Sequence, residues 1–220
     1  ANDGSAGELT AMLDVISTNL TSFFRENGHF EYLAQTALPR FAAGASKSGV
    51  RRIRAWSAGC SSGEEPYSMG ICLQENLPEF SRWDVRILAT DLSTKVLGKA
   101  AQGVYEAERV EQVSPELRNR YFTRVPQRSD RLYTINESVR RMITFGRLNL
   151  MGSWPMRGSF DIIFCRNVMI YFDKPTQGRL VDRYWDLLAP GGLLFIGHSE
   201  SLTGIKHRFR YVQPTVYQRP

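Results

Sequence analysis

The segment WSAGCSSGEEPY at positions 56–67 joins a predicted β-strand, residues 53–58, to a predicted helix, residues 64–77. A strand, a turn of small residues and a helix are typical of an α/β domain, where ligands bind at the carboxyl ends of the strands. Gly59 and Gly63 permit tight backbone conformations and let a ligand approach the main chain. The segment therefore predicts a ligand site at the end of the first strand.

The charge of this turn narrows the class of ligand. A dinucleotide fold would carry G-x-G-x-x-G here, with a phosphate at the helix N-terminus. This chain has GCSSGEEP instead, and Glu64 and Glu65 suit the helix dipole but repel a phosphate. S-adenosylmethionine fits, because it has an adenosine, a cationic sulfonium and an ammonium group that favours a carboxylate. The same residues also fit a plain turn with acidic helix-capping side chains, and the turn alone leaves both interpretations open.

Strands and helices alternate along most of the chain. Further strands are predicted at 85–90, 145–150, 160–165 and 193–197. Further helices are predicted at 8–24, 30–41, 94–101 and about 175–188, with a loop at 44–49 and a strand-like tail at 211–217 that could form a hairpin. The alternation predicts an α/β fold with a parallel sheet and helices on both faces.

One connection is too long for a simple crossover, since about sixty residues separate the helix at 94–101 from the strand at 160–165. Strand-like segments lie within it at 121–125, 132–135 and 142–145, with a turn-like segment at 126–130. We predict a small antiparallel β-subdomain, about residues 118–146, inserted into the α/β domain.

Arginine is concentrated in this insert. Residues 118–147 contain eight arginines and two acidic residues, so their net charge of +6 equals that of the whole chain. A solvated face and a docking surface for an acidic partner both fit this charge. Arginines and aromatic residues interleave, as in nucleic-acid-binding segments, but the pattern matches no nucleic-acid-binding module. We therefore expect an acidic protein partner and no nucleic acid.

Composition indicates a globular protein of a reducing compartment. Hydrophobic residues make up 42% of the 220 residues, yet no apolar run is as long as a membrane span, and no signal peptide is apparent. The three cysteines, Cys60, Cys72 and Cys165, have no metal-ligand spacing. We expect a cytoplasmic protein without membrane insertion and without a bound metal.

Polar residues follow the predicted strands at the ends that should meet the first turn. Asp91 follows the second strand, where a carboxylate can accept hydrogen bonds from ribose or cap the next helix. Asn149 and Leu150 close the third strand, where they could contact an adenine edge or form a turn. Arg166 and Asn167 follow the fourth strand. Together these strand ends predict a nucleoside site.

Four separated motifs stand in order along the chain: TNLTSFFR at 18–25, WSAGCSSGEEPYS at 56–68, FCRNVMIYFD at 164–173 and GHSES at 197–201. Together they resemble the CheR family of bacterial chemotaxis-receptor glutamate O-methyltransferases, from about residue 9 to residue 219. The resemblance implies a class I S-adenosylmethionine-dependent methyltransferase (Rossmann-like) fold with an inserted β-subdomain. The methyltransferase domain would be residues 49–220, preceded by a linker and helices, residues 1–48, that cover the cofactor site.

The resemblance also implies which residues form the site. Arg25 and Tyr171 would position the substrate carboxylate, with Tyr171 facing the methyl group. The implied cofactor-binding residues are Asn19, Thr21, Arg25, Gly59, Glu65, Asp91, Asn149, Leu150, Cys165, Arg166 and Asn167. Within this set, Glu65 would face the amino-acid end of S-adenosyl-L-methionine and Asp91 its ribose. The product would be S-adenosyl-L-homocysteine.

The implied reaction is methyl transfer to glutamate side chains in the cytoplasmic part of chemoreceptors, an acidic helical bundle. A glutamate is already ionised near pH 7, so the reaction needs alignment rather than a general base. Two alternatives stay open: a related methyltransferase for another acidic protein, and a non-catalytic module that senses S-adenosylmethionine or docks partners. The N-terminal helical domain usual in the family is expected to be missing. Residues 124–130 also lack the glycine-rich loop of members that bind a receptor's C-terminal pentapeptide.

Overall fold

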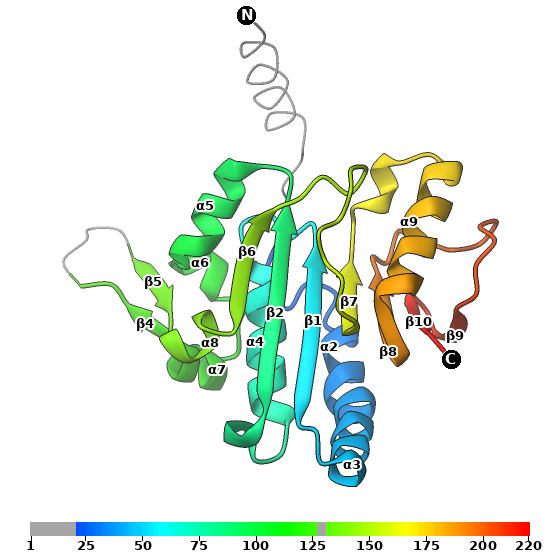
Figure 1. The fold of residues 1–220 in the computed structure, drawn as a ribbon. Helices are drawn as coiled ribbons and strands as arrows, with labels where there is room; N and C mark the ends of the chain where they lie inside the picture. Colours follow the sequence, from blue (N-terminus) through cyan, green and yellow to red (C-terminus); the bar gives the residue numbers. More distant parts are fainter. Residues whose placement is uncertain (1–20, 127–130) are drawn as a thin grey trace, which may run out of the picture.

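The computed structural model describes residues 21–126 and 131–220, which form a seven-stranded sheet covered by helices and a three-stranded sheet beside it (Figure 1). The large sheet has the order β6 (Ile143–Arg147), β2 (Asp84–Asp91), β1 (Arg52–Ala58), β7 (Phe160–Cys165), β8 (Leu188–Ile196), β10 (Val216–Gln218) and β9 (Arg210–Gln213). The first five strands in this order, β6, β2, β1, β7 and β8, are parallel to one another. Strands β10 and β9 add an antiparallel hairpin beside β8. The predicted α/β fold with a parallel sheet is confirmed.

The central strands are buried on both faces because apolar residues alternate between two hydrophobic clusters. Ala55 and Phe164 belong to the cluster that contains helix α4 (Glu64–Asn76). Trp56 belongs to the cluster that contains helix α9 (Lys174–Leu187), on the other face of the sheet (Figure 1). Strands that are apolar on both sides are characteristic of parallel sheets with helices on both faces.

The helices that follow the strands begin where the sequence predicts. Helix α5 (Thr94–Gln102) is capped by Ser93, whose Oγ accepts the Val96 amide at 3.3 Å. Single turns of 3-10 helix, η2 (Phe80–Arg82) and η3 (Met169–Tyr171), complete this part of the fold. In the part of the chain that the structure describes, no helix is long and apolar enough to cross a membrane.

Before the large sheet, three helical pieces lie end to end: α2 (Gly28–Tyr32), the π-helix η1 (Leu33–Ala37) and α3 (Leu38–Ser48). The predicted loop at 44–49 is wrong, because α3 continues to Ser48. The single glycine at position 44 costs a helix only about 1 kcal/mol relative to alanine, and the next residue, Ala45, is buried.

The predicted helix at 8–24 lies mostly outside the described residues, and its described end is wrong, since residues 21–27 are irregular chain with turns and bends. Phe24 and Glu26 have left-handed backbone conformations, with φ of +51° and +55°. Phe23 anchors the turn, because its ring packs edge-on against Tyr105 and Phe122 with centroid distances of 4.9 and 5.1 Å. The aromatic side chain of Phe23 therefore packs a turn against the small sheet and does not belong to the apolar face of a helix.

The small sheet has the order β3 (Val104–Glu106), β5 (Leu132–Ile135) and β4 (Phe122–Arg124), all antiparallel. Short helices flank these strands: α6 (Ala107–Val110), α7 (Pro115–Tyr121) and α8 (Glu137–Arg140). The predicted antiparallel sheet is present, but the predicted strand at 142–145 is assigned to the wrong sheet, because it belongs to β6 and pairs with β2. Strand β3 takes its place and is too short to give a periodic pattern. Of the predicted turn at 126–130, only Pro126 is among the described residues.

Candidate active site

The turn after β1 packs directly against the loop after β7. Gly59 and Gly63 both have φ of +99°, in the left-handed region that favours glycine. A Cβ at Gly59 would lie 2.4 Å from Val168 Cγ2, so a side chain there would push the two loops apart. The amides of Gly59 and Cys60 donate to Thr90 O at 2.8 and 2.9 Å, which fixes the turn to the end of β2. The glycine turn is therefore a tight junction of three strand ends.

Asp91 lies half-buried at the end of β2, beside this turn. Its Oδ2 accepts the Ser61 amide at 2.9 Å, and its Oδ1 accepts the Ser93 amide at 3.0 Å. Each carboxylate oxygen has two acceptor sites and can accept more than one hydrogen bond. Ser93 is the cap of helix α5 and Asp91 holds the Ser93 amide, while contact between Asp91 and a ribose stays a prediction.

The two carboxylates at the start of α4 have different surroundings. Glu64 is fully buried and pairs with Arg109. Glu65 accepts from Ser57 Oγ at 2.7 Å and lies 3.4 Å from Arg166 Nη1. Burial raises the pKa of Glu65 above its usual value, although Arg166 and Ser57 oppose the rise. A further cation would stabilise this carboxylate, so Glu65 suits an ammonium group, whereas Glu64 is a structural ion-pair partner.

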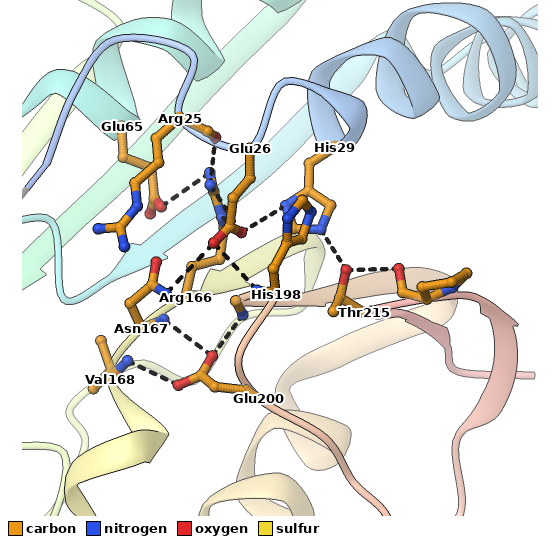
Figure 2. Close-up of polar contacts among 12 residues, drawn as sticks. Arg25, Glu26, His29, Glu65, Arg166, Asn167, Val168, His198, Glu200 and Thr215 are labelled. Atoms are coloured by element: carbon orange, nitrogen blue, oxygen red, sulfur yellow. Dashed lines mark hydrogen bonds and ion pairs between the residues drawn. The ribbon is translucent and has the colours of Figure 1, made fainter.

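Arg166 stands at the centre of an ion network (Figure 2). Its side chain is 1% exposed, with Nε and Nη2 at 3.2 and 3.1 Å from Glu26 Oε2 and Nη1 at 3.4 Å from Glu65 Oε2. Nη2 also donates to the carbonyl oxygen of Arg25. All three guanidinium nitrogens thus have partners within the protein. Arg166 therefore orients Glu65 and the Arg25 turn.

Among the described residues, Glu26, His29 and His198 come close enough together to hold a metal ion, with ligand atoms within 4.8 Å of one another. Glu26 already pairs with Arg166. The Arg166 guanidinium cannot lose its charge by deprotonation, so a metal ion would have to displace it from Glu26. Burial lowers the pKa of His29 to about 3, and its Nε2 lies 2.6 Å from Thr215 Oγ1. Because Glu26 is paired with Arg166 and His29 Nε2 with Thr215, the cluster fits a polar link between segments better than a metal centre.

Glu200 organises the loop that follows β7 (Figure 2). Its buried carboxylate accepts four backbone amides, those of Asn167 at 3.0 Å, Val168 at 2.9 Å, Ile170 at 3.2 Å and Gly197 at 2.5 Å. The loop includes Asn167 in a left-handed conformation, with φ of +59°, which is uncommon for a residue other than glycine. Glu200 therefore holds the segment that leads to the predicted catalytic tyrosine.

The predicted catalytic residues, Arg25 and Tyr171, come from two separate segments. Figure 2 shows the Arg25 side chain extending beside Glu65, and its charge opposes the burial-driven rise of the Glu65 pKa. Tyr171 ends η3 and is 58% exposed, so a protein substrate can reach it. Thr21 is half-buried at the start of the described segment, and Asn19 lies outside the described residues.

Three other predicted cofactor-binding residues differ in burial and in the contacts of their side chains. Cys165 is buried, and the Tyr184 hydroxyl donates to its Sγ at 3.1 Å. Leu150 is buried in the same hydrophobic cluster. Asn149 is exposed, and its Oδ1 accepts the Met151 amide at 2.9 Å. A cofactor contact by Cys165 would therefore involve its main chain.

All three cysteines are buried and unpaired. Burial raises the pKa of the Cys60 and Cys165 thiols well above the usual value and that of Cys72 to about 12. Because the thiolate is the reactive form, these cysteines are core residues rather than nucleophiles.

Three residues that the sequence patterns did not single out have central contacts: Glu26, His29 and Glu200. Glu26 directly follows the first motif and Glu200 lies inside the last one, so their position in the motifs was the available signal. Their partners lie far away in the sequence, which is why spacing alone could not identify their role.

Comparison with known proteins gives a consistent result over nearly the whole chain. Residues 19–218 match the family described as "CheR methyltransferase, SAM binding domain". A "Probable chemotaxis protein methyltransferase" of Rhizobium etli is 43% identical over 219 residues, which cover 99% of this chain and 81% of the relative. "Chemotaxis protein methyltransferase 2" of Pseudomonas aeruginosa is 44% identical over 98% of this chain and 75% of its own. The "Chemotaxis protein methyltransferase" of Escherichia coli is 41% identical over 96% and 71%.

Proposed function

This chain belongs to the CheR methyltransferase family, and we propose that it transfers the methyl group of S-adenosylmethionine to glutamate side chains of chemoreceptors. The products would be a glutamate methyl ester and S-adenosylhomocysteine. One observation carries the proposal: Asp91, Glu65 and Tyr171 all lie just after the carboxyl ends of parallel strands, those of β2, β1 and β7. Arg25 extends beside Glu65 at this end of the sheet (Figure 2). Residues that suit the cofactor and residues that suit an acidic acceptor are thus at the same end. We place the reaction in the cytoplasm, where the three free cysteines would stay reduced.

The donor set fits the cofactor of this family. Glu65 would accept the ammonium group, because a cation favours the charged form of a buried carboxylate. Asp91 would accept the ribose hydroxyls, because each carboxylate oxygen can accept more than one hydrogen bond. When bound, the cofactor supplies an electrophilic methyl group.

Arg25 and Tyr171 would align the acceptor glutamate. A guanidinium can hold one carboxylate oxygen and leave the other free to attack the methyl carbon in line. The exposed Tyr171 hydroxyl would donate a second hydrogen bond and fix the orientation. Because glutamate is ionised near pH 7, no proton has to be removed before the attack.

The proposal is tested by methyl transfer from S-adenosylmethionine with a labelled methyl group to chemoreceptor fragments. We expect label on glutamate as a base-labile ester and none on a matched fragment with glutamine at the modified positions. A base-stable product would contradict glutamate O-methylation. Transfer only to other acidic proteins would favour a different target, and cofactor binding without any transfer would favour a sensing module.

Asp91→Ala should weaken S-adenosylhomocysteine binding by about 1–3 kcal/mol, because the ribose hydroxyls lose an acceptor. Isothermal titration calorimetry on the folded variant measures this change. The control is Asp84→Ala, which removes an exposed carboxylate at the opposite end of β2 and should leave the affinity unchanged. Wild-type affinity in Asp91→Ala would exclude this residue from the cofactor site.

We further infer that the small sheet docks the acidic receptor. Two arginines of its flanking helices α7 and α8 have partners inside the protein: Arg120 pairs with Glu75 at 2.6 Å, and Arg140 donates to Ala101 O at 3.1 Å. Arg124 and Arg131, on β4 and just before β5, are exposed, and no carboxylate of the described residues pairs with them. These two arginines are therefore available to an acidic helical bundle.

Replacing Arg124 and Arg131 with glutamate should lower the rate constant of receptor association, because exposed charges act mainly on the rate at which two proteins encounter each other. It should also make this rate constant depend less on salt concentration, because the lost attraction is the part that salt screens, over roughly 8–10 Å. Stopped-flow association across a range of ionic strength measures both effects. The matched control changes Lys206 and Arg210 to glutamate, the same change of charge near the β9 edge of the sheet. Equal rates and salt slopes in both variants would mean that the basic face is only solvated.

A further inference from the structure

Glu26 joins the turn that carries Arg25 to two distant loops (Figure 2). Its Oε2 accepts from Arg166 Nε and Nη2 at 3.2 and 3.1 Å. Its Oε1 accepts from the His198 amide at 3.1 Å and from Asn167 Nδ2 at 3.4 Å. The side chain is only 10% exposed. A single carboxylate therefore links this turn, the loop after β7 and the loop after β8.

The surroundings keep Glu26 ionised. Burial alone would raise its pKa, but the positive charge of Arg166 and the bond from the His198 amide lower it below its usual value. Arg166 has one further acidic partner among the described residues, Glu65, at 3.4 Å. Loss of the Glu26 charge would remove the ion pair that ties the turn to Arg166, while Glu65 would keep its own pair with the buried guanidinium.

The main chain of Arg25 is held on both sides. The Phe24 amide donates to Ser68 Oγ at 2.9 Å, and the Arg25 carbonyl accepts from Arg166. Phe24 and Glu26 both have positive φ, and such conformations persist only where surrounding contacts hold them. The bonds of the Glu26 side chain hold the second of these two residues in place, together with the bond from the His29 amide to Glu26 O at 3.0 Å.

We propose that Glu26 is a positioning residue for methyl transfer, which sets where Arg25 lies relative to Tyr171 through its bonds to Arg166, Asn167 and His198. The inference rests on the proposed function, in which Arg25 holds the acceptor carboxylate. Both oxygens of Glu26 are turned toward protein donors, so it acts through Arg25 rather than on the substrate. A shift of about 1 Å in a group that aligns a reactant can lower a rate by roughly 100-fold.

The test is a double-mutant cycle on kcat with saturating cofactor and receptor fragment. Glu26→Gln keeps the size of the side chain but removes its charge, and we expect kcat to fall about 10-fold while KM for S-adenosylmethionine changes less than about 3-fold. In the Arg25→Ala background the same change should have little further effect, because the two residues act as a unit. The control is Glu31→Gln on α2, an exposed glutamate that bonds to Asn27 Nδ2 at 2.7 Å, and it should leave kcat unchanged.

A second readout needs neither cofactor nor receptor. Amide hydrogen exchange at residues 23–27 should be about 10-fold faster in Glu26→Gln than in wild type or Glu31→Gln, because the turn opens locally. Glu26→Asp, which keeps the charge but shortens the side chain, is the second variant and should change exchange and kcat in the same direction.

Two results would overturn the inference: an equal fall in kcat with and without Arg25, or unchanged exchange at residues 23–27 in both Glu26 variants. If the wild-type protein methylates no receptor fragment, the proposed function fails instead. The exchange measurement would then still decide whether Glu26 holds the turn.

Discussion

Replacing Arg25 with alanine should lower kcat for receptor methylation by about 10²–10³-fold, the usual cost of losing one donor to the reacting group. The proposed role of Arg25 is to hold one oxygen of the acceptor carboxylate, so its removal should slow the methyl-transfer step itself. Glu65 and Asp91 keep their places, so affinity for S-adenosylhomocysteine should change much less. Turnover at saturating receptor fragment and calorimetry with S-adenosylhomocysteine separate the two quantities.

The variant Arg25→Lys tests whether the rate depends on the charge of residue 25 or on the planar shape of the guanidinium group. Lysine restores the positive charge but presents a point-like ammonium group instead of a planar fork, so it should restore only part of the rate. Arg40→Ala is the control, because this exposed arginine of α3 donates to Gly191 O and neither residue is a proposed site residue. A normal rate in Arg25→Ala would mean that another residue holds the acceptor. A loss of cofactor affinity alone would make Arg25 a cofactor-binding residue.

The second large effect concerns stability. Glu200→Ala should lower the free energy of unfolding by about 2–4 kcal/mol, because buried amides that lose their acceptor are costly. For a chain of this size, each 1 kcal/mol shifts Tm by about 2–4 °C, so Tm should fall by about 5–15 °C. Glu200→Gln should also destabilise, because its amide group would turn donors toward the amides of the loop.

Thermal unfolding followed by circular dichroism measures this loss, with the exposed Glu108→Ala of α6 as the control. If Tm of Glu200→Ala stays within about 2 °C of wild type, smaller than the shift for 1 kcal/mol, then other contacts hold the loop.

The sequence predicted the large sheet well because its signals are local. Each central strand is a short apolar run, and helices such as α5 and α9 begin at side-chain caps. The small sheet was predicted less well. Strand β3 has three residues, and nothing in 142–145 distinguishes an antiparallel partner of β5 from a parallel partner of β2. That choice depends on long-range pairing, which composition does not encode.

The candidate site divides in the same way. Asp91 and Glu65 could be predicted as site residues because they stand at a strand end and a helix start, where position along the chain fixes position in the fold. The difference in role between Glu64 and Glu65 could not be predicted. It depends on their ion pairs with Arg109 and Arg166, which are distant in the sequence from each other and from the helix start. The roles of Glu26 and Glu200 are likewise set by contacts between distant segments.

The burial of all three cysteines makes this protein a convenient carrier for a chemical probe. Thiol-directed reagents such as maleimides attack the thiolate, and Cys60, Cys72 and Cys165 are both inaccessible and held as thiols. A cysteine introduced at the exposed Asn27 should therefore be modified selectively in the native protein. A fluorophore or spin label there would sit two residues from Arg25 and report motion of the turn as cofactor and receptor bind, with all native cysteines left in place.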